Sequence, residues 1–154
     1  QACAAPTANR EDTWITSVMQ QAYQHWHTAG GVHSVETWID GQLAGGLYGV
    51  CLGKMFFGES MFTRVTNASK IALVHLIRFL QQQGVTMIDC QMQTDHLASL
   101  GARTIDRAVF IDHVTAAVDQ PAIAWGSGWI DTEGAYRPTL PEGTAIPLTP
   151  FRYD

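Results

Sequence analysis

The chain has 154 residues, of which 46% are hydrophobic and only 15% are charged, a composition that excludes a disordered chain and fits a single folded domain. Its 9 lysine and arginine residues against 14 aspartate and glutamate residues give a formal net charge of −5. That balance argues against a protein that binds nucleic acid unaided, because phosphate neutralisation dominates such affinity, and it favours a small-molecule or protein partner.

The N-terminal region predicts a loop followed by a helix. Residues 1–13 are small and polar, and Thr16 or Ser17 can cap a helix that runs to about Ala29. Apolar side chains recur in it at helical spacing, namely Val18, Met19, Ala22, Tyr23 and Trp26.

A hairpin and a third strand are expected next. Residues 33–39 and 43–52 are separated by Asp40-Gly41, and aspartate followed by glycine between two such runs is a strong hairpin signal. Glycines at positions 45, 46 and 49 indicate a bulge or a close approach of the backbone to a ligand. Residues 54–59 predict the third strand.

The second half of the chain adds helices to this sheet. Asn67 is expected to cap a helix from Ala68 to about Gln83, and Gly84 to end it in the left-handed conformation. Residues 85–90 predict a short buried strand, and the helical turn expected at 96–100 is closed by Gly101.

A further helix is predicted over residues 106–118, and the chain from Pro121 onward predicts an ordered arm that packs on the domain. This element order predicts an α+β fold with a mostly antiparallel mixed sheet and packed helices.

Three scattered cysteines, Cys3, Cys51 and Cys90, make no disulfide framework and favour a reducing compartment. The first residues do not resemble a signal peptide, and no apolar run is long enough to span a membrane, so a cytoplasmic location is expected. The lack of an initial methionine indicates either processing or a piece of a longer protein.

Glu59 is the first candidate functional residue. Four large apolar side chains surround it in the segment 56–64, where the third strand is expected to end. Such a segment is either a sheet edge that enters the core, with Glu59 in water, or an apolar ligand pocket with one convergent carboxylate.

Asp89 and Gln91 form the second candidate, because strand alternation sends them to the same side with Cys90 opposite. A carboxylate beside a carboxamide can orient an amine or alcohol through the amide oxygen. The alternative is that Asp89 caps the following turn.

Cys90 is better explained as a small core residue than as a nucleophile. His25 and His27 point to different faces of their helix, so they cannot share a metal.

Several runs of the sequence occur in the same order in one family. They are Thr13-Trp14-Ile15-Thr16, His33-Ser34-Val35-Glu36, Gly45-Gly46-Leu47-Tyr48-Gly49-Val50, Phe57-Gly58-Glu59-Ser60-Met61-Phe62-Thr63-Arg64, Ala68-Ser69-Lys70-Ile71-Ala72-Leu73 and Ile88-Asp89-Cys90-Gln91. The chain resembles the leucyl/phenylalanyl-tRNA–protein transferases over about residues 1–113. Six ordered motifs make this resemblance highly specific.

The resemblance implies a GNAT-like acyltransferase fold, with residues 1–118 as the catalytic domain and residues 119–154 as the C-terminal arm. It also implies transfer of Leu or Phe, and less well Met, from charged tRNA to the α-amine of proteins that begin with Arg or Lys, which marks them for N-end rule degradation. Because the ester is already activated, no cofactor, ATP or metal is implied. The expected protein is a monomer whose partners are the aminoacyl-tRNA 3′ end and these acceptors, with no membrane.

The resemblance also assigns roles to residues. Asp89 and Gln91 correspond to the family's catalytic pair: Gln91 would orient the attacking amine, and Asp89 would polarise Gln91. Glu59 would contact the aminoacyl-adenosine end, and the terminal adenine would stack on Trp14. The positions that line the aminoacyl side-chain pocket correspond to Leu47, Phe56, Met61, Thr63 and Cys90.

Two departures and two alternatives accompany this interpretation. Family members usually begin with another domain that supplies much of the basic tRNA surface; we expect this chain to lack it and to be weak or inactive alone. The stretch 126–150 is longer than the expected tail.

A CoA-dependent N-acetyltransferase of the same fold would need a glycine-containing pyrophosphate loop where this chain has residues 64–69. A non-catalytic module that binds basic N-termini is the other alternative.

Overall fold

The structure, a computed structural model, describes residues 2–5 and 13–138. Its elements are η1 (Ala2–Ala4), α1 (Ser17–Thr28), β1 (Val32–Ile39), β2 (Gln42–Leu52), β3 (Met55–Thr63), α2 (Ala68–Gln82), β4 (Ile88–Asp89), α3 (Asp95–Ser99), α4 (Arg107–Val118), β5 (Gly128–Ile130) and β6 (Tyr136–Pro138). The main sheet has the order β1-β2-β3-β4: the first three strands are antiparallel, and β4 is parallel to β3. The predicted α+β class with a mixed sheet is confirmed.

The local signals at the start of the fold act as the sequence predicts. The Thr16 hydroxyl accepts a hydrogen bond from the Met19 backbone N–H at 3.3 Å and so caps α1. Asp40 and Gly41 have φ values of 50° and 71°, and this pair of left-handed residues gives the tight turn between β1 and β2. Gly84 likewise ends α2 with φ 77°.

Two expected strand boundaries were wrong, and one predicted cap lacks its side-chain hydrogen bond. β3 runs on to Thr63 instead of ending at position 59, because the β2–β3 ladder continues beyond an irregularity. Only Ile88 and Asp89 of the expected strand 85–90 pair with β3. Asn67 is the N-cap residue of α2, as predicted, but it is left-handed with φ 66° and its side chain makes no capping hydrogen bond.

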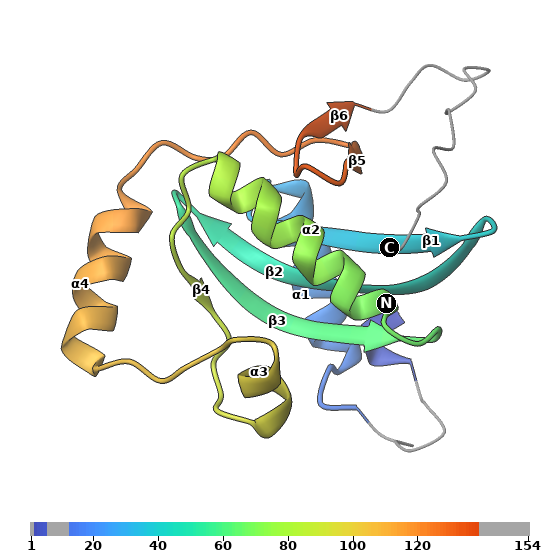
Figure 1. Cartoon of the computed structure of the whole chain (residues 1–154), viewed down its shortest axis with the longest axis horizontal. Coiled ribbons are helices and arrows are strands. Elements are labelled where there is room, and N and C mark those ends of the chain that lie inside the picture. Colours follow the sequence, from blue (N-terminus) through green and yellow to red (C-terminus); the bar gives the residue numbers. More distant parts are fainter. Residues whose placement is uncertain (1, 6–12, 139–154) are drawn as a thin grey trace.

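The core lies between the sheet and α2, which crosses one face of the sheet while α1 lies on the other (Figure 1). Phe56 of β3 is 1% exposed and Leu76 of α2 is fully buried. The chain after α4 completes this core: Ile123 is buried, and the Trp125 ring lies 4.9 Å from the Phe79 ring. The arm expected from residue 119 therefore contributes to the core, and β5 and β6 pair as a small hairpin; its residues 139–154 lie outside the described part.

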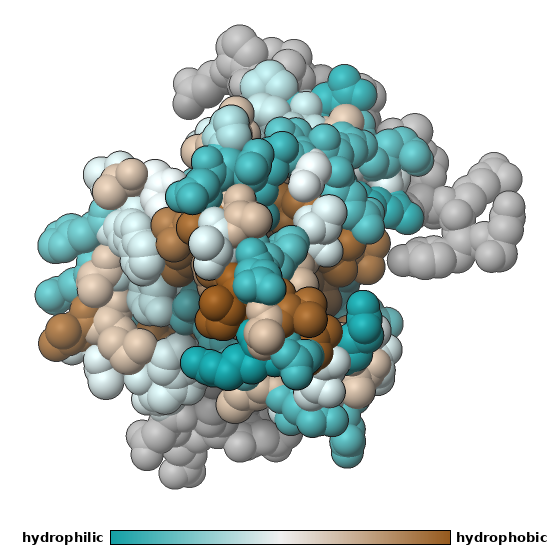
Figure 2. Space-filling view, turned by 90° about the vertical axis from the view of Figure 1, so that its left-hand side faces the viewer, coloured by the Kyte–Doolittle hydropathy of each residue, from teal (hydrophilic) through white to brown (hydrophobic). Residues whose placement is uncertain are grey.

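One helix, α4, is apolar yet exposed. Val109 is 57% and Ile111 is 46% exposed, and Ala117 is the one residue of α4 that is buried. Figure 2 looks onto this side of the molecule and shows hydrophobic side chains gathered in the middle of the face. No helix within the described residues is both long and apolar enough to cross a membrane.

Candidate functional site

Glu59 owes its position to a bulge. In the β2–β3 ladder Tyr48 pairs with Ser60 and Gly49 pairs with Gly58, so Glu59 has no partner across the strand. A bulge of this kind redirects a side chain and is common beside active sites. The Glu59 carboxylate accepts a hydrogen bond from the Tyr23 hydroxyl at 2.7 Å and another from Gln91 Nε2 at 3.3 Å. The bulge thus places one carboxylate between a helix and the turn that follows β4.

The turn after β4 brings Asp89 and Gln91 to the same place. Phe57 pairs in parallel with Asp89, so the end of β4 lies beside the bulge of β3. Asp89 Oδ1 accepts a hydrogen bond from the backbone N–H of Gln91 at 2.8 Å, and Gln91 has φ 64°. A left-handed glutamine costs of order 1 kcal/mol, and the Asp89 contact helps to hold it there.

This arrangement differs from the one that strand alternation predicts. Gln91 lies beyond the strand, and its carboxamide contacts Glu59, while Asp89 contacts the backbone of Gln91. The turn-capping interpretation of Asp89 therefore describes its hydrogen bond in this structure. Because the carboxamide donates to Glu59 through Nε2, its oxygen is left to accept from an amine.

Sequence reasoning missed Tyr23 and Tyr48 as parts of the site. Their rings meet edge to face at 5.2 Å, and burial together with the Glu59 carboxylate raises the pKa of Tyr23 to about 12. Burial also raises the pKa of Tyr48, whose hydroxyl is buried and has no hydrogen-bond partner among the described residues. Helical spacing marked Tyr23 as an apolar contact of α1, but no local signal connects it with a carboxylate 36 residues later.

The other predicted site residues differ in how deeply they are buried. Leu47 and Phe56 are buried in the core with α2, and Met61 packs against them. Cys90 is half-buried, and burial and then the nearby Asp89 charge raise the pKa of its thiol, which disfavours the reactive thiolate. Trp14 is 51% exposed, and the hydroxyl of the exposed Thr63 donates to the Val65 carbonyl oxygen. Neither is bonded to Glu59, Asp89 or Gln91 in the described part of the chain.

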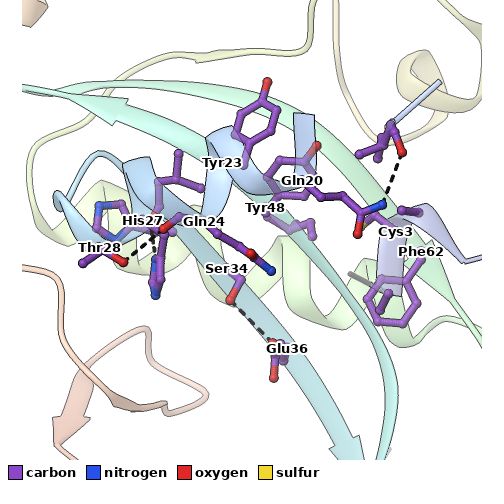
Figure 3. Close-up of a pocket in the computed structure, with 16 residues that line it drawn as sticks. Cys3, Gln20, Tyr23, Gln24, His27, Thr28, Ser34, Glu36, Tyr48 and Phe62 are labelled. Carbon is purple, nitrogen blue, oxygen red and sulfur yellow. Dashed lines mark hydrogen bonds between the residues drawn. The ribbon is translucent and has the colours of Figure 1, made fainter. Parts of the chain in front are cut away.

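A pocket of about 370 Å³ opens on the α1 side of the sheet, between η1, α1 and strands β1 to β3 (Figure 3). Tyr23, Tyr48 and Phe62 supply aromatic walls to it. Of the predicted site residues, Leu47 alone lines this pocket. No group of three or more histidine, cysteine, aspartate or glutamate residues within the described ranges is arranged to hold a metal.

Comparisons with known proteins agree on one family. The family model described as leucyl/phenylalanyl-tRNA protein transferase matches residues 1–115. A leucyl/phenylalanyl-tRNA–protein transferase of Bordetella petrii is 62% identical over 136 residues, which cover 88% of this chain and 54% of that protein. Those of Bordetella bronchiseptica and Chromobacterium violaceum are each 60% identical, over 90% and 79% of this chain and 55% and 52% of their own lengths. The chain spans about half the length of these curated relatives.

Proposed function

The chain belongs to the leucyl/phenylalanyl-tRNA–protein transferase family, and on that premise we propose that it holds the reaction centre of an aminoacyl transfer. The observation that carries this proposal is the contact of Gln91 Nε2 with Glu59, beside the turn that Asp89 stabilises. Glu59 and Gln91 come from distant segments and are hydrogen-bonded, and the Asp89 carboxylate accepts from the Gln91 backbone N–H beside them. These groups suit an amine that gains positive charge as it attacks a carbonyl carbon.

In the proposed reaction the α-amine of an acceptor protein attacks the carbonyl carbon of a Leu, Phe or Met ester on the 3′ end of tRNA. A C–N bond forms, the ester C–O bond breaks, and the amine proton passes to the departing ribose oxygen. The Gln91 carboxamide oxygen orients the amine by accepting a hydrogen bond from one of its N–H groups. Asp89 and Glu59 offset the positive charge that develops on the amine, and the activated ester supplies the driving force without ATP.

We assign the donor to the side of the sheet where the apolar residues lie. Leu47, Phe56 and Met61 would bound a slot for an unbranched-at-β apolar side chain, with Cys90 and Thr63 at its margins. Met61 is suited to adapt to Leu, Phe or Met, because its thioether side chain is flexible. The exposed ring of Trp14 would stack on the terminal adenine.

The fold that we propose is GNAT-like. Three antiparallel strands are followed by α2 and by β4 parallel to β3, and this order supports the proposal. The same region disfavours the CoA-dependent alternative: residues 64–69 contain no glycine, and Asn67 supplies the left-handed backbone there. The Ala68 N–H, which a phosphate at the start of α2 would use, already donates to the Val65 carbonyl oxygen at 3.0 Å.

The acceptors in this proposal are proteins with an N-terminal Arg or Lys, which the transfer would mark for N-end rule degradation. Residues 1–118 would form the catalytic domain and residues 119–154 its arm, working as a monomer in the cytoplasm. Tight binding of tRNA would need basic surface beyond this acidic chain, since each neutralised phosphate contributes to affinity.

The test is transfer of radiolabelled Leu or Phe from charged tRNA to a peptide that begins with Arg. It is run with this chain alone and with this chain fused to the part of the Bordetella petrii relative that it does not match. We expect weak transfer by the chain, efficient transfer by the fusion, and a loss of about 100-fold or more in the Gln91→Ala fusion. A fusion that folds but transfers no amino acid would contradict the enzyme assignment. It would favour the alternative of a non-catalytic module that binds basic N-termini.

The role of Asp89 is tested in the same fusion. Asp89→Asn keeps an oxygen that can accept from the Gln91 N–H, so the turn should persist while the negative charge is lost. We expect kcat to fall with little change in thermal stability. Unchanged kcat would show that Asp89 serves the turn alone.

A further inference from the structure

The pocket of about 370 Å³ on the α1 side of the sheet has no role in the transfer as described so far. It lies between α1 and the β1–β2 hairpin, and Figure 3 draws the residues of both that line it. Its lining mixes apolar side chains with aromatic and polar ones, and Glu36 gives it a carboxylate that the core covered by α2 lacks. The two faces of the sheet therefore suit ligands of different chemistry.

The charge of the lining residues favours a cationic ligand in the pocket. Glu36 of β1 is the one acidic side chain among its lining residues, and no lysine or arginine lines it. The Glu36 carboxylate accepts hydrogen bonds from the neutral Trp38 indole at 3.0 Å and Ser34 hydroxyl at 3.5 Å. The single ion pair within residues 2–5 and 13–138 joins Arg137 and Asp131, so Glu36 has no ion-pair partner in that part of the chain. The basic side chains that line the pocket are the imidazoles of His27 and His33.

The aromatic walls add a second preference for a cation. The rings of Tyr23 and Tyr48 meet edge to face, and both line the pocket with Phe62. Aromatic faces attract ammonium and guanidinium groups and also pack against an aliphatic stem.

Tyr23 joins this pocket to the proposed reaction centre. Its ring lines the pocket, and its hydroxyl donates to Glu59 Oε2 at 2.7 Å. A ligand whose amine lies at Glu59 and Gln91 can therefore extend a side chain along the Tyr23 ring into the pocket. A neutral or acidic side chain in the pocket would form no favourable charge interaction with the Glu36 carboxylate.

We propose that the pocket between α1 and the β1–β2 hairpin binds the cationic side chain of the acceptor's first residue, with Glu36 as its counter-charge. This inference rests on the proposed transferase function and assigns the acceptor side chain to a space that shares only Leu47 with the proposed donor slot. The guanidinium or ammonium group lies at Glu36, near the open rim of the pocket. The aliphatic stem lies against Tyr23 and Tyr48.

The test uses two probes of equal shape, argininamide and citrullinamide, titrated into the 154-residue chain by NMR. We expect argininamide to shift resonances of Tyr23 and Tyr48 and to bind about fivefold more tightly than neutral citrullinamide, as a partly solvated ion pair with ring contacts allows. Glu36→Gln keeps an oxygen that can accept from the Trp38 indole, and it should remove this difference. Equal affinity of the two probes for the unaltered chain would overturn the proposal, and this comparison needs no variant.

Glu133→Gln is the matched control, because Glu133 lies in the β5–β6 turn and does not line the pocket. It should bind argininamide as the unaltered chain does. Loss of the probe preference in both variants would show that net charge, and not the pocket, holds the cation.

Kinetics of the transferring fusion separate this inference from the proposed function. Glu36→Gln should raise KM for the Arg-peptide about fivefold and change kcat less than twofold. Transfer with unchanged KM would overturn the pocket assignment and leave the enzyme assignment intact. Glu36-dependent binding of argininamide by a chain whose fusion transfers nothing would support a cation pocket and contradict the transferase.

Discussion

Removing the Tyr23 hydroxyl should uncouple α1 from the bulge of β3. Tyr23→Phe deletes the donor that holds Glu59 Oε2 at 2.7 Å while keeping the ring that meets Tyr48 at 5.2 Å. The pair joins segments 36 residues apart, so the loss should be felt in the stability of the whole chain. Glu59 would keep Gln91 as its remaining donor among the described residues.

The expected magnitude follows from the geometry. A hydrogen bond to a charged group contributes about 1.5–3 kcal/mol, and short O–H···O⁻ contacts are at the strong end of the range. Both side chains are only partly buried, and solvent weakens the pair. We therefore expect Tyr23→Phe to lower the free energy of unfolding by about 1 kcal/mol, a fall in Tm of about 2–4 °C for a chain of this length.

The assay is a double-mutant cycle by urea unfolding, with Tyr23→Phe, Glu59→Ala and the double variant. The coupling energy should be about 1 kcal/mol, because the second change costs little once the first has removed the contact. Tyr136→Phe is the control: it removes a hydroxyl that donates to the Ser127 carbonyl oxygen, and its effect should add to that of Glu59→Ala without coupling. A coupling below about 0.3 kcal/mol between Tyr23 and Glu59 would refute the proposed bond.

The pKa of Tyr23 is raised to about 12 in the folded chain, against an ordinary value of 10.0. The protonated Tyr23 hydroxyl should therefore contribute fully to stability below pH 10, and this contribution should be lost between pH 10 and about pH 12. ¹³C NMR of the tyrosine ring should show the titration, and a midpoint near pH 10 would contradict the raised pKa. Tyr48→Phe removes a buried hydroxyl without a described partner and should raise the free energy of unfolding by about 1 kcal/mol, whereas a loss of stability in urea would reveal a partner. Gly49→Ala forces a Cβ against the Phe57 carbonyl oxygen and the Phe56 ring and should cost about 3 kcal/mol. Gly58→Ala meets its nearest atom at 3.4 Å and should cost far less, so equal losses in thermal unfolding would show that crowding is not the cause.

Local chemistry explains why much of the fold could be predicted from the sequence. The turn at Asp40-Gly41 needs two residues that accept positive φ, and the cap at Thr16 needs a side-chain oxygen; both requirements are met by neighbouring residues. The end of α2 at Gly84 is of the same kind. These features require no knowledge of the rest of the chain.

The bulge and the contacts that it creates could not be predicted in the same way. Gly58 and Glu59 suggest the end of a strand, yet β3 continues to Thr63 because β2 supplies partners on both sides of the bulge. The Tyr23–Glu59 bond and the packing of Trp125 on Phe79 join residues that are distant in the chain. The resemblance named Glu59, Asp89 and Gln91, but pairing between β3 and β4 was needed to place them together.

The central claim is that Gln91 and Glu59 form the centre of an acyl transfer within this chain. The most direct measurement avoids the need to bind a whole tRNA: it follows transfer of Phe from the minimal ester 3′-O-phenylalanyl-adenosine to an Arg-peptide by the 154-residue chain. We predict transfer above the uncatalysed aminolysis rate, lost in Gln91→Ala and strongly reduced in Glu59→Gln. Transfer at the uncatalysed rate by the folded chain, or transfer that Gln91→Ala leaves unchanged, would contradict the role of Gln91 and Glu59 as the centre of the acyl transfer.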